Sequence, residues 1–182
     1  MIIAGVDPGS RVTGYGIIKV EGNHFQCLDY GVISTTGRGC PSELKDRLLK
    51  IFESLSDVLD KYSPDYLVVE SVFYARNVHS SLLLGHVRGV ILLSAARAGL
   101  PVIEYTPLEV KKAVTGYGRA DKEQVQTMVK RLLNLDTIPQ PHDASDALAL
   151  AICQGFGGAR SSKRGRRWSE SDLKQAMHRD PC

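Results

Sequence analysis

Short apolar runs separated by turn residues fill the first part of the chain. The first run covers residues 2–6 and stops at Asp7, where a Pro-Gly-Ser turn signal follows. A second run covers residues 14–20, and a third lies within residues 25–34 after a Glu-Gly-Asn turn. Three short strands joined by tight turns predict an antiparallel meander at this end of the chain.

A helical pattern comes next. Its apolar residues recur at helical intervals and mark one face of a long helix, which Pro41 and Ser42 open and which ends before Pro64. The residues of this face are Leu44, Leu48, Ile51, Phe52, Leu55, Val58, Leu59 and Tyr62.

The rest of the chain alternates strand and helix and predicts an α/β fold. The further elements are a strand over residues 66–69 ending at Glu70, a helix over about 78–98, a strand over 102–105, and helical patterns near 108–114, 121–133 and 143–153. The first three strands are expected to be antiparallel, and the last two, which follow helical crossovers, are expected to be parallel. Together they give a five-stranded mixed sheet flanked by helices. We expect one domain over residues 1–158 and a basic, flexible tail over residues 159–182.

The helix over residues 78–98 is apolar around more than one face. A helix of this kind is covered on more than one side. One interpretation is burial between the sheet and neighbouring helices. The other is that one side packs on a second copy of the protein, with Leu82, Leu83 and Ile91 in the interface.

Charge is distributed unevenly along the chain. The net charge is +3, yet residues 159–182 alone carry seven Lys or Arg against three Asp or Glu. Taking these from the totals of 23 and 20 leaves 16 basic and 17 acidic residues in residues 1–158. The body is therefore no uniformly basic binder, and any surface for nucleic acid must segregate its cations onto one face.

The cysteines and the first residues favour a cytoplasmic protein. Four cysteines show no C-x-x-C spacing and no partner histidines at zinc-site intervals, which fits free thiols in a reducing compartment. Met1 leads directly into an apolar strand pattern without the basic region of a signal peptide. The most apolar stretch, residues 81–96, contains His86 and Arg88, which argues against a membrane span.

Four carboxylates stand at positions where the fold would gather them. Asp7 and Glu70 each end an apolar strand, and strand ends are where open α/β sheets place ligands. Asp143 and Asp146 lie three positions apart in the first turn of a predicted helix and share one face. If the first and fourth strands are neighbours and this helix docks beside them, all four carboxylates converge.

Converging carboxylates repel one another unless a cation compensates. An all-oxygen donor set suits Mg²⁺ or Mn²⁺, and two such ions about 4 Å apart hydrolyse phosphodiesters without a covalent nucleophile. His142 adjoins the cluster and either positions a water or is solvated. Taken singly, Asp7 is also explained as a turn residue, Glu70 as a polar strand end, and Asp143 or Asp146 as a helix-capping or dipole-stabilising residue. Spacing alone indicates a carboxylate metal site and leaves the substrate open.

The segments around these carboxylates resemble the RuvC family of Holliday-junction resolvases. The resemblance runs from residue 2 to about residue 154 and consists of several motifs in order. The motifs are residues 7–16 (DPGSRVTGYG), 66–73 (YLVVESVF), 75–77 (ARN), 84–90 (LGHVRGV), 104–105 (EY), 122–125 (KEQV) and 143–149 (DASDALA).

This resemblance implies a ribonuclease H-like fold and a homodimer that nicks opposed strands of a four-way DNA junction with Mg²⁺ or Mn²⁺, two ions per site when DNA is bound. It implies that the four carboxylates are catalytic metal ligands and that RuvA and RuvB, a branch-migration complex, are partners. It also implies that Phe73 stacks on junction bases and that Lys111 and Lys122 lie near the scissile phosphate. Arg76 and Arg119 are further candidates for phosphate contacts.

Three other functions compete with the junction resolvase. An actin-like phosphate-binding domain shares the Asp-Pro-Gly-Ser turn but needs a second phosphate loop and an adenosine-binding segment, for which 182 residues leave little room. A ribonuclease H-like nuclease with another nucleic-acid substrate has similar acidic motifs. A purely structural junction binder leaves four carboxylates unexplained beside DNA.

Overall fold

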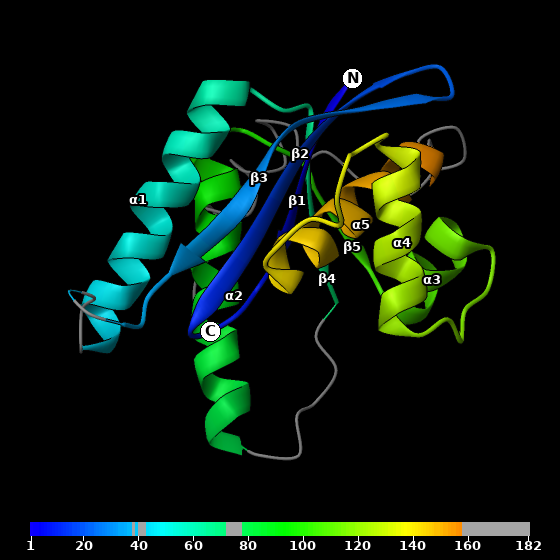
Figure 1. Ribbon diagram of the computed structural model, residues 1–182. Helices are drawn as coiled ribbons and strands as arrows, with labels where there is room; N and C mark the ends of the chain where they lie inside the picture. Colours follow the sequence, from blue (N-terminus) through cyan, green and yellow to red (C-terminus); the bar gives the residue numbers. More distant parts are fainter. Residues whose placement is uncertain (38, 40–42, 72–77, 158–182) are drawn as a thin grey trace, which may run out of the picture.

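A five-stranded mixed sheet forms the centre of the protein, with its strands in the order β3-β2-β1-β4-β5 (Figure 1). β1 pairs antiparallel with β2, β2 antiparallel with β3, and β4 runs parallel to both β1 and β5. The computed structural model describes residues 1–37, 39, 43–71 and 78–157. The strands are β1 (Ile2–Asp7), β2 (Val12–Glu21), β3 (His24–Ser34), β4 (Tyr66–Glu70) and β5 (Val102–Tyr105). The predicted sheet, with three antiparallel strands and two parallel ones, is confirmed.

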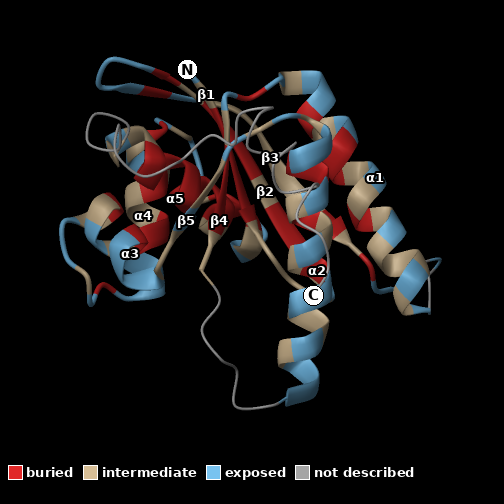
Figure 2. Cartoon of the chain, turned by 180° about the vertical axis from the view of Figure 1, so that it is seen from behind, coloured by how far each residue is buried: buried red, intermediate tan, exposed pale blue. Residues whose placement is uncertain are grey.

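The helices form one layer on each face of the sheet (Figure 1). α1 (Leu44–Tyr62) and α2 (Val78–Arg97) cover one face, and α3 (Pro107–Thr115), α4 (Lys122–Leu132) and α5 (His142–Gly157) lie on the other. Because strand side chains alternate between faces, Ala4 and Val6 pack towards α1 and α2 while Ile3 packs towards α5. Figure 2 shows the resulting band of buried residues along the central strands and α5.

α5 continues beyond the predicted end near residue 153. It runs to Gly157 because its last turn packs against β3, where the rings of Phe25 and Phe156 meet edge to face at 4.8 Å. A Cβ on Gly155 would lie 2.3 Å from the Phe25 ring, so a glycine here lets the helix reach the strand. The apolar contact therefore extends the helix through two glycines that otherwise disfavour it.

Glycines on β1 and β2 let α5 lie directly on the sheet. A Cβ on Gly5 would be 2.0 Å from the carbonyl oxygen of Ala147, and one on Gly14 would be 2.0 Å from that of Asp143. A Cβ on Gly16 would meet the side chain of Leu148 at 2.7 Å. Side chains at these positions would hold the helix away, so the glycines decide how closely the residues of α5 approach β1.

α2 has a buried side and an exposed side, and this corrects one expected interface residue. Ile91 is fully buried against α1 and the sheet, so it belongs to the core of the single chain. Leu82 is 60% exposed and Leu83 is partly exposed. The first turns of α2 extend past the strand ends and carry mostly exposed residues (Figure 2).

Among the described helices, α2 alone has the length and hydropathy that would suffice to cross a membrane. Its packing against α1 gives the same composition a different explanation, since a helix covered by protein on one side needs apolar residues there. The tail over residues 159–182 lies outside the described residues and stays a prediction.

Candidate active site

Asp7 and Glu70 stand side by side at the ends of two neighbouring parallel strands. Val6 of β1 pairs with Val69 of β4, so the next residue on each strand is one of these two carboxylates. Each lies two positions after a residue that faces α5, namely Gly5 and Val68, and therefore points to that same face. Strand pairing and the period of two thus bring together two residues that are 63 positions apart.

Asp143 and Asp146 come to the same place through the first turn of α5. Gly14 is paired with Asp7 across β1 and β2, and the backbone of Asp143 rests on Gly14. The start of α5 therefore lies next to Asp7. Asp146 follows one turn later on the same side of the helix.

The carboxylates act on one another electrostatically. Burial, together with the negative charges of Asp146, Glu70 and Asp143, raises the pKa of Asp7 from 3.8 to about 7. Burial and the charge of Asp146 also raise the pKa of Glu70. Like charges collected in a half-buried site cause shifts of this direction, and a cation would relieve them.

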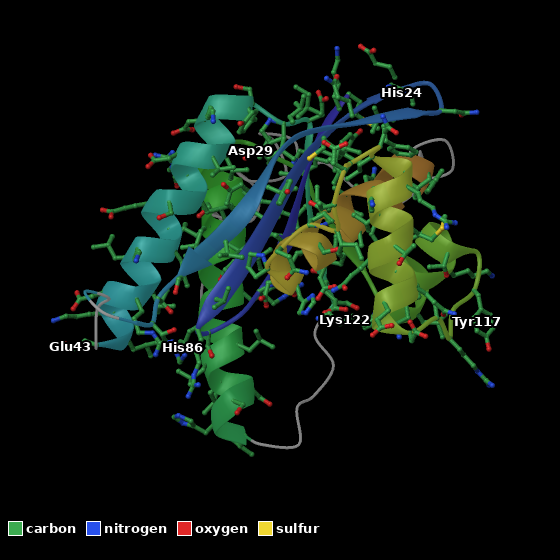
Figure 3. The ribbon with its side chains drawn as sticks, in the orientation of Figure 1. His24, Asp29, Glu43, His86, Tyr117 and Lys122 are labelled. Atoms are coloured by element: carbon green, nitrogen blue, oxygen red, sulfur yellow. The ribbon has the colours of Figure 1, made fainter. Side chains whose placement is uncertain are left out.

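One cation is already provided by Lys122 at the start of α4. Asp121 caps this helix, exchanging hydrogen bonds with Gln124 in a capping box. The Lys122 ammonium, labelled in Figure 3, reaches across to α5 and lies 2.8 Å from Asp146 Oδ2. The hydrogen bond to Asp146 raises the pKa of Lys122, and the charges of Asp146, Asp143 and Asp7 add to this, so the side chain stays charged.

A cavity of about 240 Å³ opens at this cluster. Three of the four carboxylates line it, together with Lys111, Lys122 and an apolar floor from α3, α4 and α5. Lys112, the neighbour of Lys111, is exposed and does not line it. The lining residues are Asp7, Glu70, Pro107, Val110, Lys111, Lys122, Val125, Asp146, Ala149 and Leu150.

The carboxylate oxygens are the type of donor that a hard divalent cation prefers, but they are not arranged as a complete ligand shell. Within the described part of the chain, no three Asp, Glu, His or Cys side chains are close enough to ligate one ion. Asp146, Glu70 and Asp143 nevertheless lie near enough to Asp7 for their charges to add to the effect of burial on its pKa. A set of oxygen ligands without sulfur suits Mg²⁺ or Mn²⁺.

His142 is held by a contact that the sequence did not reveal. The side-chain amide of Gln126, which is almost fully buried, lies with Nε2 2.7 Å from Nδ1 of His142. The contact pairs a buried side-chain amide with one nitrogen of the imidazole and fixes the orientation of the His142 ring. Together with the Lys122–Asp146 ion pair, this contact joins α4 to the start of α5. The one signal in the sequence was the position of Gln126 four residues after Lys122, on the same face of α4.

The remaining predicted contact residues are Arg119, Phe73 and Arg76. Arg119 is exposed on the loop between α3 and α4 and does not line the cavity. Phe73 and Arg76 lie outside the described residues, so their roles stay predictions. Asp143 lies within the first turn of α5, which begins at His142, and so is not the residue that precedes the helix as a cap.

Comparison with known proteins identifies the family. Residues 3–154 match the family model described as crossover junction endodeoxyribonuclease RuvC. Proteins of that name from Geobacter sulfurreducens and Ruminiclostridium cellulolyticum are similar to this chain. They are 54% and 50% identical over 153 and 155 residues, which is 84% and 85% of this chain and 91% and 92% of theirs.

Solved structures agree with the sequence comparisons. The structure of Thermus thermophilus RuvC in complex with a Holliday junction substrate superposes with a TM-score of 0.80 at 32% identity, over 89% of this chain and 98% of that one. The yeast mitochondrial Holliday junction resolvase Ydc2, at 14% identity and a TM-score of 0.56, shares the fold, over 86% of this chain and 80% of that one. The fold is ribonuclease H-like, and the chain belongs to the RuvC family of crossover junction endodeoxyribonucleases.

Proposed function

We propose that this protein resolves Holliday junctions in recombination and repair by paired, metal-dependent nicks in opposed strands that leave ligatable ends. The observation that carries the proposal is the meeting of Asp7, Glu70 and Asp146 in one cavity with Lys111 and Lys122. The relatives at about half identity carry the name of this activity.

The residues divide the work between holding cations and holding DNA. Asp7, Glu70, Asp143 and Asp146 hold Mg²⁺ or Mn²⁺, and bound ions supply an activated water and stabilise charge on the scissile phosphate. Lys122, which the carboxylates keep charged, and Lys111, which also lines the cavity, bind phosphate oxygens and fix the strand there. Both lysines also offset the local excess of negative charge, which would otherwise repel DNA.

A cleavage comparison tests the substrate. We expect Mg²⁺ or Mn²⁺ to support cutting of a synthetic four-way junction at a rate at least about a hundredfold above that of a linear duplex of the same sequence. A phosphate-binding domain of the actin-like class would instead be stabilised by nucleotides and cut neither substrate. Equal cutting of junction and duplex would favour a ribonuclease H-like nuclease with a different substrate and would contradict the proposal.

We also propose that the protein acts as a homodimer through the exposed side of α2. Exposed residues recur three or four positions apart along this helix and form one stripe. At two of them, Gly85 and Gly89, an added Cβ would meet nothing within 4 Å, which leaves the backbone open to close approach by a second helix. The stripe is Val78, Leu82, Gly85, Gly89 and Leu93. A junction with two-fold symmetry and opposed cuts also requires two active sites.

Charge placed on this stripe tests the dimer. Leu82→Glu is expected to separate the chains, because two buried carboxylates would face each other across a symmetric interface. Light scattering at micromolar protein should then give a mass near the 19.9 kDa of one chain, and opposed double nicks should become single nicks. Leu49→Glu on α1 is the matched control, since Leu49 is also about half exposed. A wild-type protein that is already monomeric, or a Leu82→Glu protein that stays dimeric, would count against this interface.

The other assignments are consistent with this function, and those for Phe73 and for RuvA and RuvB rest on the family resemblance. We propose a cytoplasmic location, a branch-migration complex of RuvA and RuvB as partner, and base stacking by Phe73. Arg76 and Arg119 are proposed to contact phosphates of the junction.

A further inference from the structure

Arg88 joins α2 to the strand end that carries Glu70. Its side chain is only 16% exposed and lies on the side of the sheet opposite α5. Nη1 donates a hydrogen bond of 2.8 Å to the main-chain oxygen of Glu70, and Nη2 lies 2.5 Å from Glu104 Oε1 on β5. We infer that Arg88 is a positioning residue that fixes the backbone of Glu70, and thereby its carboxylate, for metal binding and cleavage.

The backbone of Glu70 needs an additional contact because Glu70 lies where the pairing between β4 and β1 stops. β4 pairs with β1 only as far as Val69, so among the described strands Glu70 is paired with β5 alone. On that side, Ser71 donates its main-chain N–H to the oxygen of Tyr105 at 2.8 Å. Arg88 of α2 adds a second hydrogen bond, made to the main-chain oxygen of Glu70 itself.

The contact acts on the backbone and not on the carboxylate. Glu104 is paired with Val69 and shares its face, which is the face of α1 and α2. The Glu70 side chain points to the other face, towards α5, and Arg88 is not among the residues that line the cavity. An effect of Arg88 on cleavage must therefore pass through the position of Glu70.

A guanidinium is the group suited to this task. Its planar fork donates to two acceptors at once, here a main-chain carbonyl and a carboxylate, and both hydrogen bonds are charge-assisted. A lysine ammonium would keep the ion pair with Glu104 but would not span both acceptors in the same geometry. Metal ligands must be held within about 0.5 Å of the productive position, so loss of one tie has a measurable cost.

The backbone just after β1, the strand that ends at Asp7, is also held by an arginine from the helices on this face. Arg47 of α1 donates to the main-chain oxygen of Ser10 and, at 3.3 Å, to Thr35 Oγ1. The Thr35 hydroxyl in turn donates to the oxygens of Ser10 and Arg11. The helical layer on the far side of the sheet thus supplies one arginine to the backbone at the end of β4 and one to the backbone just beyond β1, the two strands that end in a catalytic carboxylate.

The test separates positioning from stability and rests on the proposed role of Glu70 in cleavage. Arg88→Gln, Arg88→Lys and Glu104→Gln are compared with wild type in single-turnover cleavage of a four-way junction. Junction affinity is measured by fluorescence anisotropy with Ca²⁺, and Mn²⁺ affinity by the shift in unfolding temperature that Mn²⁺ causes. Asp7→Asn serves as the inactive reference.

We expect Arg88→Gln to slow cleavage at saturating Mn²⁺ by about tenfold or more, because misplacing a reacting group has effects of this size. Its junction affinity should stay within about twofold of wild type, since the largely buried Arg88 is engaged with Glu70 and Glu104 and does not line the cavity. Arg88→Lys should lose rate as well, although it keeps the ion pair. Glu104→Gln, which retains the bond from Arg88 to Glu70, should stay within about threefold of wild type. Both Arg88 variants should need more Mn²⁺ for the same thermal shift.

Several results would overturn the inference. A wild-type cleavage rate in either Arg88 variant would contradict it. Equal losses of cleavage rate in Arg88→Gln and Glu104→Gln would also contradict it, because they would indicate a purely structural ion pair. A slower rate explained fully by weaker junction binding would also do so. If Arg88→Gln does not fold, Arg88→Lys decides alone, and full activity there contradicts the inference. Wild-type protein that fails to cut junctions would instead contradict the proposed function.

Discussion

Replacing Asp7 with Asn is expected to abolish cleavage while making the metal-free protein more stable at pH 8. The amide removes a metal ligand at the centre of the cluster, and a loss of about 4 kcal/mol in transition-state stabilisation corresponds to about a thousandfold in rate. Junction binding should persist, because the lysines of the cavity remain and a negative charge beside DNA is removed.

The gain in stability follows from the direction of the pKa shift. The pKa of Asp7 is raised from 3.8 to about 7, so between these values the folded protein binds more protons at this site than the unfolded chain. The stability of wild type therefore falls as pH rises through this window, and the cost is complete above pH 7. The shift sets an upper limit of about 4 kcal/mol, and we expect roughly 1–3 kcal/mol because Asn is also a buried polar group.

Urea unfolding in EDTA at pH 5 and pH 8 measures this effect. The advantage of Asp7→Asn over wild type should be larger at pH 8 than at pH 5, and Mg²⁺ should reduce it by stabilising only wild type. Asp57→Asn, at an exposed position on α1, is the control and should change neither stability nor cleavage. Equal stability of Asp7→Asn and wild type at pH 8 would contradict the charge cluster. Retained cleavage would contradict the ligand role.

Replacing Gly14 with Ala is expected to impair both the fold and the active site. The added Cβ would lie 2.0 Å from the carbonyl oxygen of Asp143, a backbone atom that cannot rotate away. The start of α5 must then move off the sheet by about 1 Å, which costs about 3 kcal/mol of stability as overpacking does. Because Asp143 and Asp146 move with it, cleavage should fall by more than about a hundredfold.

Gly118→Ala is the control for this substitution. Its Cβ would meet the flexible side chain of Leu108 at 3.3 Å and the carbonyl oxygen of Leu108 at an ordinary contact distance of 3.7 Å, so the unfolding temperature should change little. Circular dichroism and single-turnover cleavage measure the two effects separately. If Gly14→Ala retained wild-type stability and rate, the close approach of α5 to β2 would not be what positions the carboxylates.

The sequence was sufficient to predict the strands, which of them run antiparallel or parallel, and the helices. Apolar alternation and turn residues are local signals, and the predicted ends of β1 and β4 lie within one residue of the observed ends and those of β2 within two. Helix ends were less well predicted. The end of α5 depends on Phe25 packing against Phe156, a contact across 131 positions that no local pattern contains.

In the candidate site, too, the sequence predicted the residues with local signals and missed those that depend on long-range contacts. Asp7 and Glu70 were recognisable because each ends an apolar run, and Asp143 and Asp146 because they share a helix face. The prediction for Ile91 was wrong, since an apolar helix does not reveal which of its sides the rest of the chain covers. Arg88 and Gln126 passed unnoticed as site-supporting residues, because a polar residue on a helix is usually solvated.

By itself the sequence determined which side chains could hold a cation, through strand ends, helix spacing and the family motifs. Only the tertiary structure decided how they meet. β1 and β4 had to pair, and α5 had to approach β2 as closely as Gly14 permits. It also decided which basic groups serve the site, placing Lys122 on Asp146 and Arg88 on the backbone of Glu70. These are non-local contacts, and their energies depend on distances that the order of residues does not specify.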